Sequence, residues 1–309
     1  MTNQPGRSNF VHVRDVTLRD GFQDERFVAT DEKIALFGAL VAAGITDLEL
    51  TSFVRPDRVP ALADAEALVR ATQSTEGVQR WGLVLNAKGA ERALAVGLTN
   101  LQFVVSVSES HQRANAGGTV AQSLIQLREI VKIVRATPAS VAVEVTLATA
   151  FGCPFSGPVP ESDVLKVLEK VLEEGIDAVS LADTIGVAVP TEVTSLVSHV
   201  RQVTDLTPVG VHLHDTRGLG IANALAALDA GASRIDGTVG GLGGCPFAPG
   251  ASGNLPLEDL IHALHAMGMN TGVKLEQLLE AAKLACQLVG QPVSSHVGVA
   301  GPRFARRPN

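Results

Sequence analysis

The sequence predicts an α/β fold, a closed (β/α)8 barrel (TIM barrel) with additional C-terminal helices. Short apolar, β-branched runs recur along the whole chain, and each is followed by a longer stretch of helical periodicity. Several of these stretches end at a glycine directly before the next apolar run, as at Gly44, Gly97, Gly175 and Gly231. The runs number about eight, as a closed barrel requires. A doubly wound open sheet is the main alternative, but no clean Gly-x-Gly-x-x-Gly follows the first strand.

The expected strands, in chain order, are Val11–Leu18, Asp47–Ser52, Trp81–Leu85, Gln102–Val107, Val141–Thr146, Ala178–Leu181, Val209–Leu213 and Arg234–Val239. Amphipathic stretches between them predict helices, several opened by Thr, Ser or Pro: Asp31–Ala43, Val120–Arg135, Ser162–Glu174 and Pro190–Val203. Two further helices, Leu257–Met267 and Leu275–Leu288, follow the last strand without a low-complexity linker. We therefore expect one catalytic domain over residues 1–309, with the barrel over about 10–255, extra helices over about 256–291 and a tail over 292–309.

The composition excludes several classes of protein. With 46% hydrophobic and 18% charged residues, the chain is too apolar to be disordered, and it has no stretch that resembles a membrane span. The net charge is −7 and the basic tail 303–307 is short, so we expect no nucleic-acid partner and no membrane partner. An odd number of cysteines, 3, and a polar segment 1–10 without a signal sequence predict a cytoplasmic protein.

Polar side chains gather where the predicted strands end. In a barrel of this kind the carboxyl ends of the strands form one face, and buried charges there are costly unless they bind a ligand. These residues are Arg19 and Asp20 after the first strand, Glu49 in the second, Asn86 and Lys88 after the third, Asp183 after the sixth, and His212 and His214 at the end of the seventh.

His212 and His214 are candidate metal ligands. Because side chains alternate along a strand, both imidazoles point to the same side of the barrel. A hydrogen-bonded pair of core histidines would give the same spacing, so the motif alone is weak. Asp20 and Asn254 would add a carboxylate and an amide oxygen, a set that suits Mg²⁺ or Mn²⁺ better than a closed structural Zn²⁺, although ligand type does not exclude zinc. Such a site predicts Lewis-acid chemistry on an oxygen-bearing substrate.

A glycine-rich stretch, residues 240–254, follows the last strand and is typical of a mobile active-site loop. Cys245 lies within it, where an exposed thiol could donate or accept a proton. Cys153 and Cys286 are expected to be ordinary packed thiols.

Three long motifs resemble the metal-dependent TIM-barrel lyases and synthases, and most closely the 3-hydroxy-3-methylglutaryl-CoA (HMG-CoA) lyases. They are TLRDGFQDE over residues 17–25, HLHDT over 212–216 and GLGGCPFAPGASGN over 241–254. The last reproduces the cysteine-loop signature of these lyases, with Phe247 in place of Tyr. Further matching segments extend the resemblance over nearly the whole chain: 49–54, 86–89, 151–155 and 180–187.

The resemblance implies cleavage of HMG-CoA to acetyl-CoA and acetoacetate with a divalent metal, Mg²⁺ or Mn²⁺, and no organic cofactor beyond the CoA of the substrate. It implies these roles: metal ligation by Asp20, His212, His214 and Asn254; polarisation of the thioester carbonyl by Arg19, which Glu49 orients; removal of the hydroxyl proton by Asp20 or a metal-linked water; and proton transfer by Cys245. Gln23, Asn86, Lys88 and Asp183 are the expected substrate-binding residues. A homodimer that binds an acyl-CoA is the expected assembly.

The chain departs from the better-known lyases at Arg26, Thr146, Ala148 and Arg217, which points to a different acyl pocket and leaves a related 3-hydroxyacyl-CoA as an alternative substrate. A Claisen-type synthase of the isopropylmalate or citramalate kind shares the first two motifs but lacks the Cys-Pro-Phe-Ala-Pro insertion found here. A non-catalytic barrel that binds acyl-CoA is the remaining alternative, and it would be expected to lose ligands that this chain retains.

Overall fold

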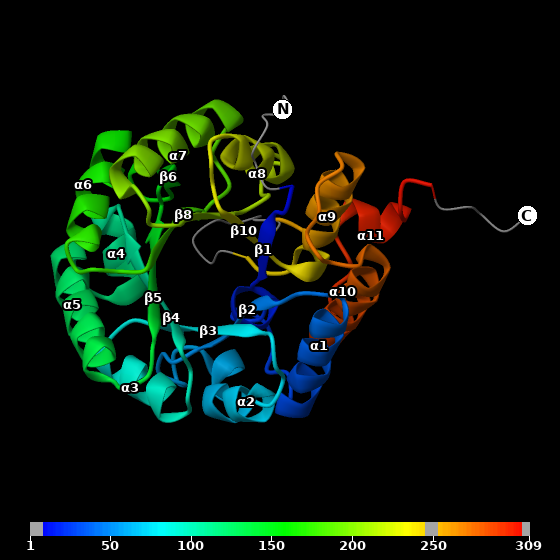
Figure 1. Cartoon of the computed structure of the whole chain (residues 1–309), viewed down its shortest axis with the longest axis horizontal. Coiled ribbons are helices and arrows are strands. Elements are labelled where there is room, and N and C mark those ends of the chain that lie inside the picture. Colours follow the sequence, from blue (N-terminus) through cyan, green and yellow to red (C-terminus); the bar gives the residue numbers. More distant parts are fainter. Residues whose placement is uncertain (1–8, 245–252, 305–309) are drawn as a thin grey trace, which may run out of the picture.

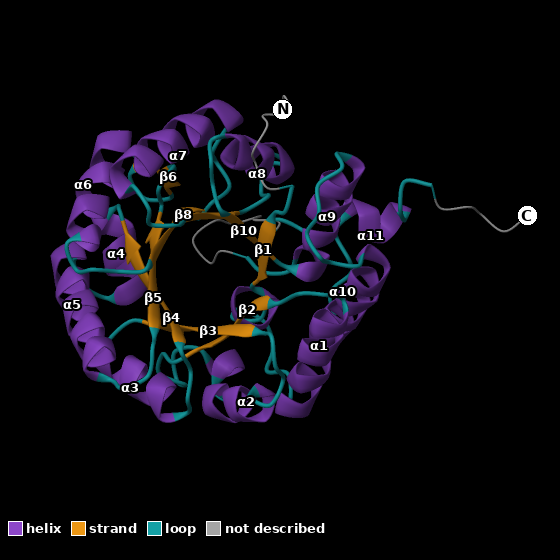
Figure 2. Ribbon diagram, in the orientation of Figure 1, coloured by secondary structure: helices purple, strands orange, loops and turns teal. Residues whose placement is uncertain are grey.

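Residues 9–244 and 253–304 are described in the computed structural model of the chain, and they include a closed barrel of eight parallel strands in the order β1-β10-β9-β8-β5-β4-β3-β2. The barrel strands are β1 (His12–Asp15), β2 (Asp47–Ser52), β3 (Gln79–Val84), β4 (Asn100–Ser106), β5 (Ala142–Ala148), β8 (Ala178–Asp183), β9 (Val209–Leu213) and β10 (Arg234–Gly237). Figure 2 shows these strands enclosing the interior, with the helices outside them. The (β/α)8 fold expected from the sequence is confirmed.

Helices follow the strands around the outside of the barrel (Figure 1). They are α1 (Thr30–Ala42), α2 (Ala65–Thr72), α3 (Ala87–Ala95), α4 (Glu109–Ala116), α5 (Val120–Ala136), α6 (Glu161–Leu172), α7 (Pro190–Thr204) and α8 (Gly220–Asp229). A 3-10 turn, η2 (Pro60–Leu62), precedes α2, and a small hairpin of β6 (Gly152–Cys153) and β7 (Gly157–Pro158) precedes α6. Val and Leu side chains of the strands and the helices are buried between the two layers and form the main core.

Three helices after the barrel, α9 (Leu257–Ala266), α10 (Leu275–Val289) and α11 (His296–Ala300), lie together on one side of it. Helix α10 packs against α1, and α11 packs against α9. The two expected C-terminal helices therefore form within one residue of their predicted ends. Within the described residues, no helix is both long enough and apolar enough to span a bilayer.

The first strand is shorter than the sequence predicts. We expected a strand over Val11–Leu18, but β1 ends at Asp15 and a π-helix, η1 (Thr17–Gly21), follows. The carbonyl of Val16 accepts hydrogen bonds from the amides of Asp20 (2.8 Å) and Gly21 (3.1 Å), so the chain winds a wide turn across the mouth of the barrel. The last strand also ends early, at Gly237, before a second 3-10 turn, η3 (Val239–Gly241). The interiors of both turns are buried.

Candidate active site

A cavity of about 900 Å³ opens at the carboxyl ends of the strands. Asp20, His212 and His214 line it together with Arg19, and all four side chains are buried. Barrels of this type place their chemistry at this face, because the loops after the strands supply adaptable side chains above a rigid sheet. Four of the polar residues predicted at strand ends therefore lie together in this cavity.

Asp20, His212 and His214 bring three ligand atoms to one point. The Nε2 atoms of His212 and His214 are 3.2 Å apart, and Oδ2 of Asp20 lies 3.8 Å from the first and 3.7 Å from the second. Neighbouring ligands of an octahedral cation with bonds of about 2.1 Å are separated by about 3 Å, so small side-chain movements would let all three contact one ion. Among the described residues, this is the group that could hold a metal ion.

Asn254 joins this group from the far end of the glycine-rich stretch. Its Nδ2 donates to Oδ2 of Asp20 (2.7 Å) and to the carbonyl of Leu242 (3.2 Å). Its Oδ1 is buried and has no hydrogen-bond partner among the described residues. A buried amide oxygen without a partner is costly, and a cation would satisfy it. The donor set of two imidazoles, a carboxylate and an amide oxygen therefore fits a divalent ion.

The charges at the site keep Asp20 ionised. Burial alone would raise the pKa of this carboxyl, but the Arg19 guanidinium and the two histidines hold it well below its usual range. Burial likewise lowers the pKa of His212, but Asp236 and Asp20 outweigh it and raise that pKa above its ordinary value. A carboxylate that stays charged is a good metal ligand and a weak base.

Arg19 is held from both sides. It donates one hydrogen bond to Asp20 and forms an ion pair with Glu49, 2.8 Å between Nη2 and Oε2. Burial lowers the pKa of Arg19, but Glu49 and Asp20 outweigh that effect and raise the pKa above its usual value. The guanidinium therefore remains charged in a buried position. The site thus contains a fixed positive charge beside the candidate metal ligands.

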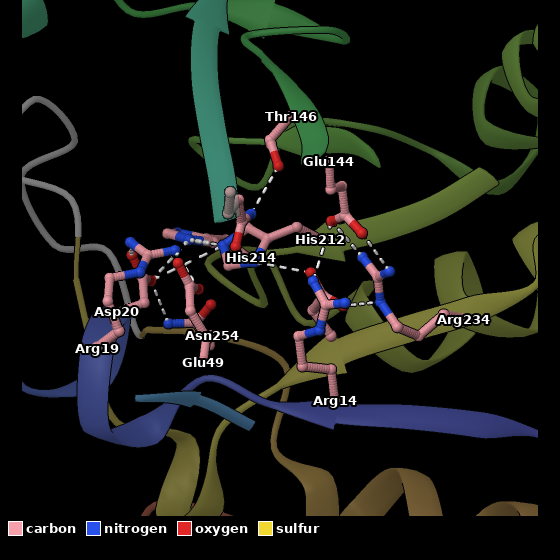
Figure 3. Close-up of polar contacts among 12 residues, drawn as sticks. Arg14, Arg19, Asp20, Glu49, Glu144, Thr146, His212, His214, Arg234 and Asn254 are labelled. Atoms are coloured by element: carbon pink, nitrogen blue, oxygen red, sulfur yellow. Dashed lines mark hydrogen bonds and ion pairs between the residues drawn. The ribbon is translucent and has the colours of Figure 1, made fainter. Parts of the chain in front are cut away.

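Glu49 in turn is supported by Gln102, which the sequence did not assign to the site, and Gln102 is held by Thr146, which the sequence placed in the acyl pocket. The Gln102 amide donates to Oε1 of Glu49 (2.8 Å), and its oxygen accepts from the Thr146 hydroxyl (2.7 Å). Gln102 and Thr146 both line the cavity. Figure 3 shows Thr146 above Glu49 and the two histidines. A polar side chain inside a strand, such as Gln102, was the available signal.

The expected substrate-binding residues lie at different distances from this centre. Gln23 lines the cavity and donates to Oδ1 of Asp20 (3.1 Å). Asn86 also lines it, while its Oδ1 accepts from the amide of Gly89 (3.0 Å) and caps α3. Lys88 is exposed on the first turn of α3 and is not a lining residue. Asp183 is buried and accepts from the amides of residues 187 (2.9 Å) and 188 (3.0 Å), so it holds the turn after β8.

The three cysteines differ in position. Cys245 lies outside the described residues, next to Gly244, which lines the cavity. Cys153 and Cys286 are buried and free. Cys153 accepts a hydrogen bond from the Ser108 hydroxyl (2.9 Å). Burial raises the pKa of its thiol, but serine hydroxyls outweigh that effect and lower the pKa to about 6.

Comparison with known proteins places this geometry among lyases. The HMGL-like family model matches residues 11–285. The chain is 38% identical to a hydroxymethylglutaryl-CoA lyase of Bacillus subtilis, over 92% of this chain and 95% of that protein. It is 39% identical to the mitochondrial hydroxymethylglutaryl-CoA lyase of Mus musculus, over 94% of this chain and 89% of that protein.

A solved structure is similar over the same length. It is that of an HMG-CoA lyase from Acinetobacter baumannii in complex with coenzyme A and 3-methylmalate. Its TM-score to this chain is 0.93 at 38% sequence identity, and the match covers 99% of this chain and 100% of the other.

Proposed function

Because this chain belongs to the HMGL-like family, we propose that the cavity at its barrel mouth binds an acyl-CoA substrate beside a divalent cation, Mg²⁺ or Mn²⁺. The chain is a carbon–carbon lyase, and its reaction is the cleavage of HMG-CoA to acetyl-CoA and acetoacetate. The observation that carries the assignment of residues is the convergence of Asp20, His212 and His214 on one point beside the buried Arg19.

The reaction breaks the bond between the carbinol carbon and the α-carbon of the thioester. The hydroxyl proton must leave, and the departing fragment is an enolate whose oxygen carries negative charge. A divalent cation bound here would act as a Lewis acid and lower the pKa of the substrate hydroxyl group. Asp20, His212, His214 and Asn254 would hold that cation.

Arg19 supplies the charge that the enolate requires. Its guanidinium is buried, paired with Glu49 and therefore fixed before the reaction begins. A preorganised donor of this kind stabilises charge that develops in the transition state without reorganisation. Glu49 would act as a positioning residue, since it pairs with Arg19, and Gln102 would support Glu49 in that place.

Proton transfer completes the proposal. The low pKa of Asp20 suits a ligand better than a base, which favours water as the acceptor of the hydroxyl proton. Cys245 would return a proton to the α-carbon of the enolate, so that acetyl-CoA leaves as a neutral thioester. Gln23 and Asn86 would bind the substrate within the cavity, and Lys88 and Asp183 would act at its edge. We further propose a cytoplasmic homodimer with one catalytic domain over residues 1–309.

A second substrate is favoured by one observation. Thr146 and Ala148, which stand where better-known lyases carry an aromatic residue and a serine, both line the cavity. A threonine is smaller than an aromatic residue, so a related 3-hydroxyacyl-CoA with a different acyl group is the alternative. The metal ligands would be the same for either substrate.

The test is the release of acetoacetate from HMG-CoA by the purified protein with Mg²⁺ or Mn²⁺. We expect turnover that EDTA abolishes, that Cys245→Ser lowers sharply and that His212→Ala removes together with metal binding. Cys286→Ser is the matched control, because this thiol is buried between α10 and η3, away from the cavity. Metal binding without turnover of HMG-CoA, but with turnover of a bulkier hydroxyacyl-CoA, would select the alternative substrate.

A further inference from the structure

A network of buried charges crosses the barrel interior beneath the candidate metal site. Glu144 on β5 accepts from Arg14 on β1 (3.0 Å) and binds both terminal nitrogens of Arg234 on β10 (2.6 and 2.7 Å). Arg14 also donates to Asp47 (2.9 Å), and Arg234 donates through Nε to Asp236 (2.7 Å). Two arginines thus alternate with three carboxylates across the barrel. Figure 3 labels Arg14, Glu144 and Arg234 of this network.

One end of this network reaches His212. Asp236 and His212 are partners on the neighbouring strands β10 and β9. Oδ1 of Asp236 is fixed by Arg234, and its Oδ2 lies 3.7 Å from Nδ1 of His212. This Oδ2 atom is buried and has no hydrogen-bond partner among the described residues. A proton on Nδ1 of His212 could satisfy it, because a small turn of the ring would form that hydrogen bond.

The two nitrogens of His212 therefore face different partners. Nε2 points to His214 and Asp20, the other candidate ligands, whereas Nδ1 points to Asp236. A neutral imidazole carries one proton, so a proton held on Nδ1 leaves the lone pair of Nε2 free for a cation. Carboxylates that accept from the outer nitrogen of a metal-bound histidine fix both its tautomer and its ring orientation.

We propose that Asp236 is a positioning residue, which holds His212 with Nδ1 protonated and Nε2 directed at the cation, and that Arg234 and Glu144 hold Asp236 in that place. The proposal rests on the proposed function, since it assumes that His212 binds a metal. Its consequence is that the affinity of the site for metal depends on a residue in a strand interior that does not itself touch the ion.

The first experiment measures Mn²⁺ binding to EDTA-treated protein by isothermal titration calorimetry. Asp236→Asn keeps the side-chain volume and an oxygen for Arg234, which also remains paired with Glu144. We expect about 10–100-fold weaker Mn²⁺ binding, the range found when such outer carboxylates are replaced. Turnover should fall at limiting Mn²⁺ and largely recover when the metal is saturating, because the substrate-binding residues are unchanged.

Asp47→Asn is the matched control. It removes the same charge from the opposite end of the network, where Asp47 pairs with Arg14 and not with a candidate metal ligand. We expect its Mn²⁺ affinity to stay within about threefold of the wild type. Equal weakening in both variants would mean that the network acts only through its total charge or through stability, and it would overturn the positioning role. Unchanged Mn²⁺ affinity in Asp236→Asn would overturn it as well.

A measurement on the wild-type protein tests the proposal even if Asp236→Asn fails to fold. Long-range ¹H–¹⁵N correlation spectra of the metal-free wild type, assigned by loss of the His212 signals in His212→Gln, report which nitrogen carries the proton. A proton on Nδ1 supports the proposal, and one on Nε2 overturns it. If the wild type binds no Mn²⁺ at all, the proposed function fails at its metal step, while the tautomer still decides whether Asp236 orients His212.

Discussion

Glu144 is the centre of the buried charge network, and Glu144→Gln should destabilise the protein strongly. The carboxylate is fully buried and accepts three hydrogen bonds, one from Arg14 and two from Arg234. Glutamine has nearly the same volume but no charge, and its amide nitrogen would face a guanidinium donor. Among the described residues, the two arginines would then keep Asp47 and Asp236 as counter-ions at their outer sides.

The magnitude follows from burial. Breaking a buried ion pair by neutralising one partner costs about 3–5 kcal/mol, because the other charge remains buried without compensation. At about 1.36 kcal/mol for each tenfold change, the unfolded fraction should rise roughly 10²–10⁴-fold. With about 2 °C lost per kcal/mol in a chain of this size, Tm should fall by about 6–10 °C.

Urea unfolding followed by circular dichroism measures this difference. The control is Glu280→Gln, the same substitution at an ion pair with Lys283 whose side chains are 72% and 59% exposed, and it should cost at most about 0.5 kcal/mol. The two arginines lower the pKa of Glu144 against the opposing effect of burial. The contribution of Glu144 to folding stability is therefore present above its pKa in the unfolded chain, about 4.3, and is lost as the pH falls below that value. A loss under 1 kcal/mol at pH 7 would refute the view that this carboxylate compensates both guanidinium groups.

Three further outcomes are expected. Arg19→Lys should lower kcat by about 10²–10³-fold with little change in KM, because lysine keeps the charge but not the planar guanidinium that binds Glu49 and Asp20 together. A variant that retains more than a tenth of the wild-type kcat in steady-state kinetics would contradict this role. Burial raises the pKa of Glu258 to about 7, so the favourable contribution of this residue to folding stability is present below the unfolded value of about 4.3 and is lost as the pH rises through 7. The stability of Glu258→Gln relative to the wild type, measured by urea unfolding, should therefore increase between pH 5 and pH 8. A constant difference between the two proteins would contradict the pKa shift. Mn²⁺ at 100 times its Kd should stabilise the wild type by about 2.7 kcal/mol, which is an increase in Tm of about 5 °C in thermal unfolding scans. EDTA should reverse this increase, and Asn254→Ala should diminish it. An equal increase in the variant would remove Asn254 from the ligand set.

The sequence was sufficient for the barrel because strand and helix periods differ and alternate clearly along the chain. It also indicated that His212 and His214 share a face, since that follows from the period of a single strand. It did not indicate Gln102 or Asp236, because their roles depend on partners that lie on neighbouring strands and are far away in the sequence. Glu144 is a charge inside an apolar run of the sequence, but its pairing with Arg14 and Arg234 depends on the closure of the barrel.

The end of the first strand shows a different limit. Residues 11–18 have the apolar, β-branched composition of a strand, yet the structure ends the strand at Asp15 and winds Thr17–Gly21 into a π turn. No local propensity favours such a turn, because its wide ring is costly by itself and is stabilised only by the surrounding structure. Sequence patterns therefore place Arg19 and Asp20 near the site without showing how they enter it.

The number of residues in that π turn is also a requirement of the active site. Side chains of adjacent residues in a strand point to opposite faces, so Arg19 and Asp20 could not both enter the barrel from a simple continuation of β1. The wide turn accommodates one residue more than an ordinary helical turn and brings both side chains inward. Deleting Leu18 would leave every residue assigned to the chemistry present in the sequence, yet it would rotate one of the pair out of the site. A relative of this protein that keeps all those residues but has a gap at this turn should therefore be tested for activity before it is assumed to be an enzyme.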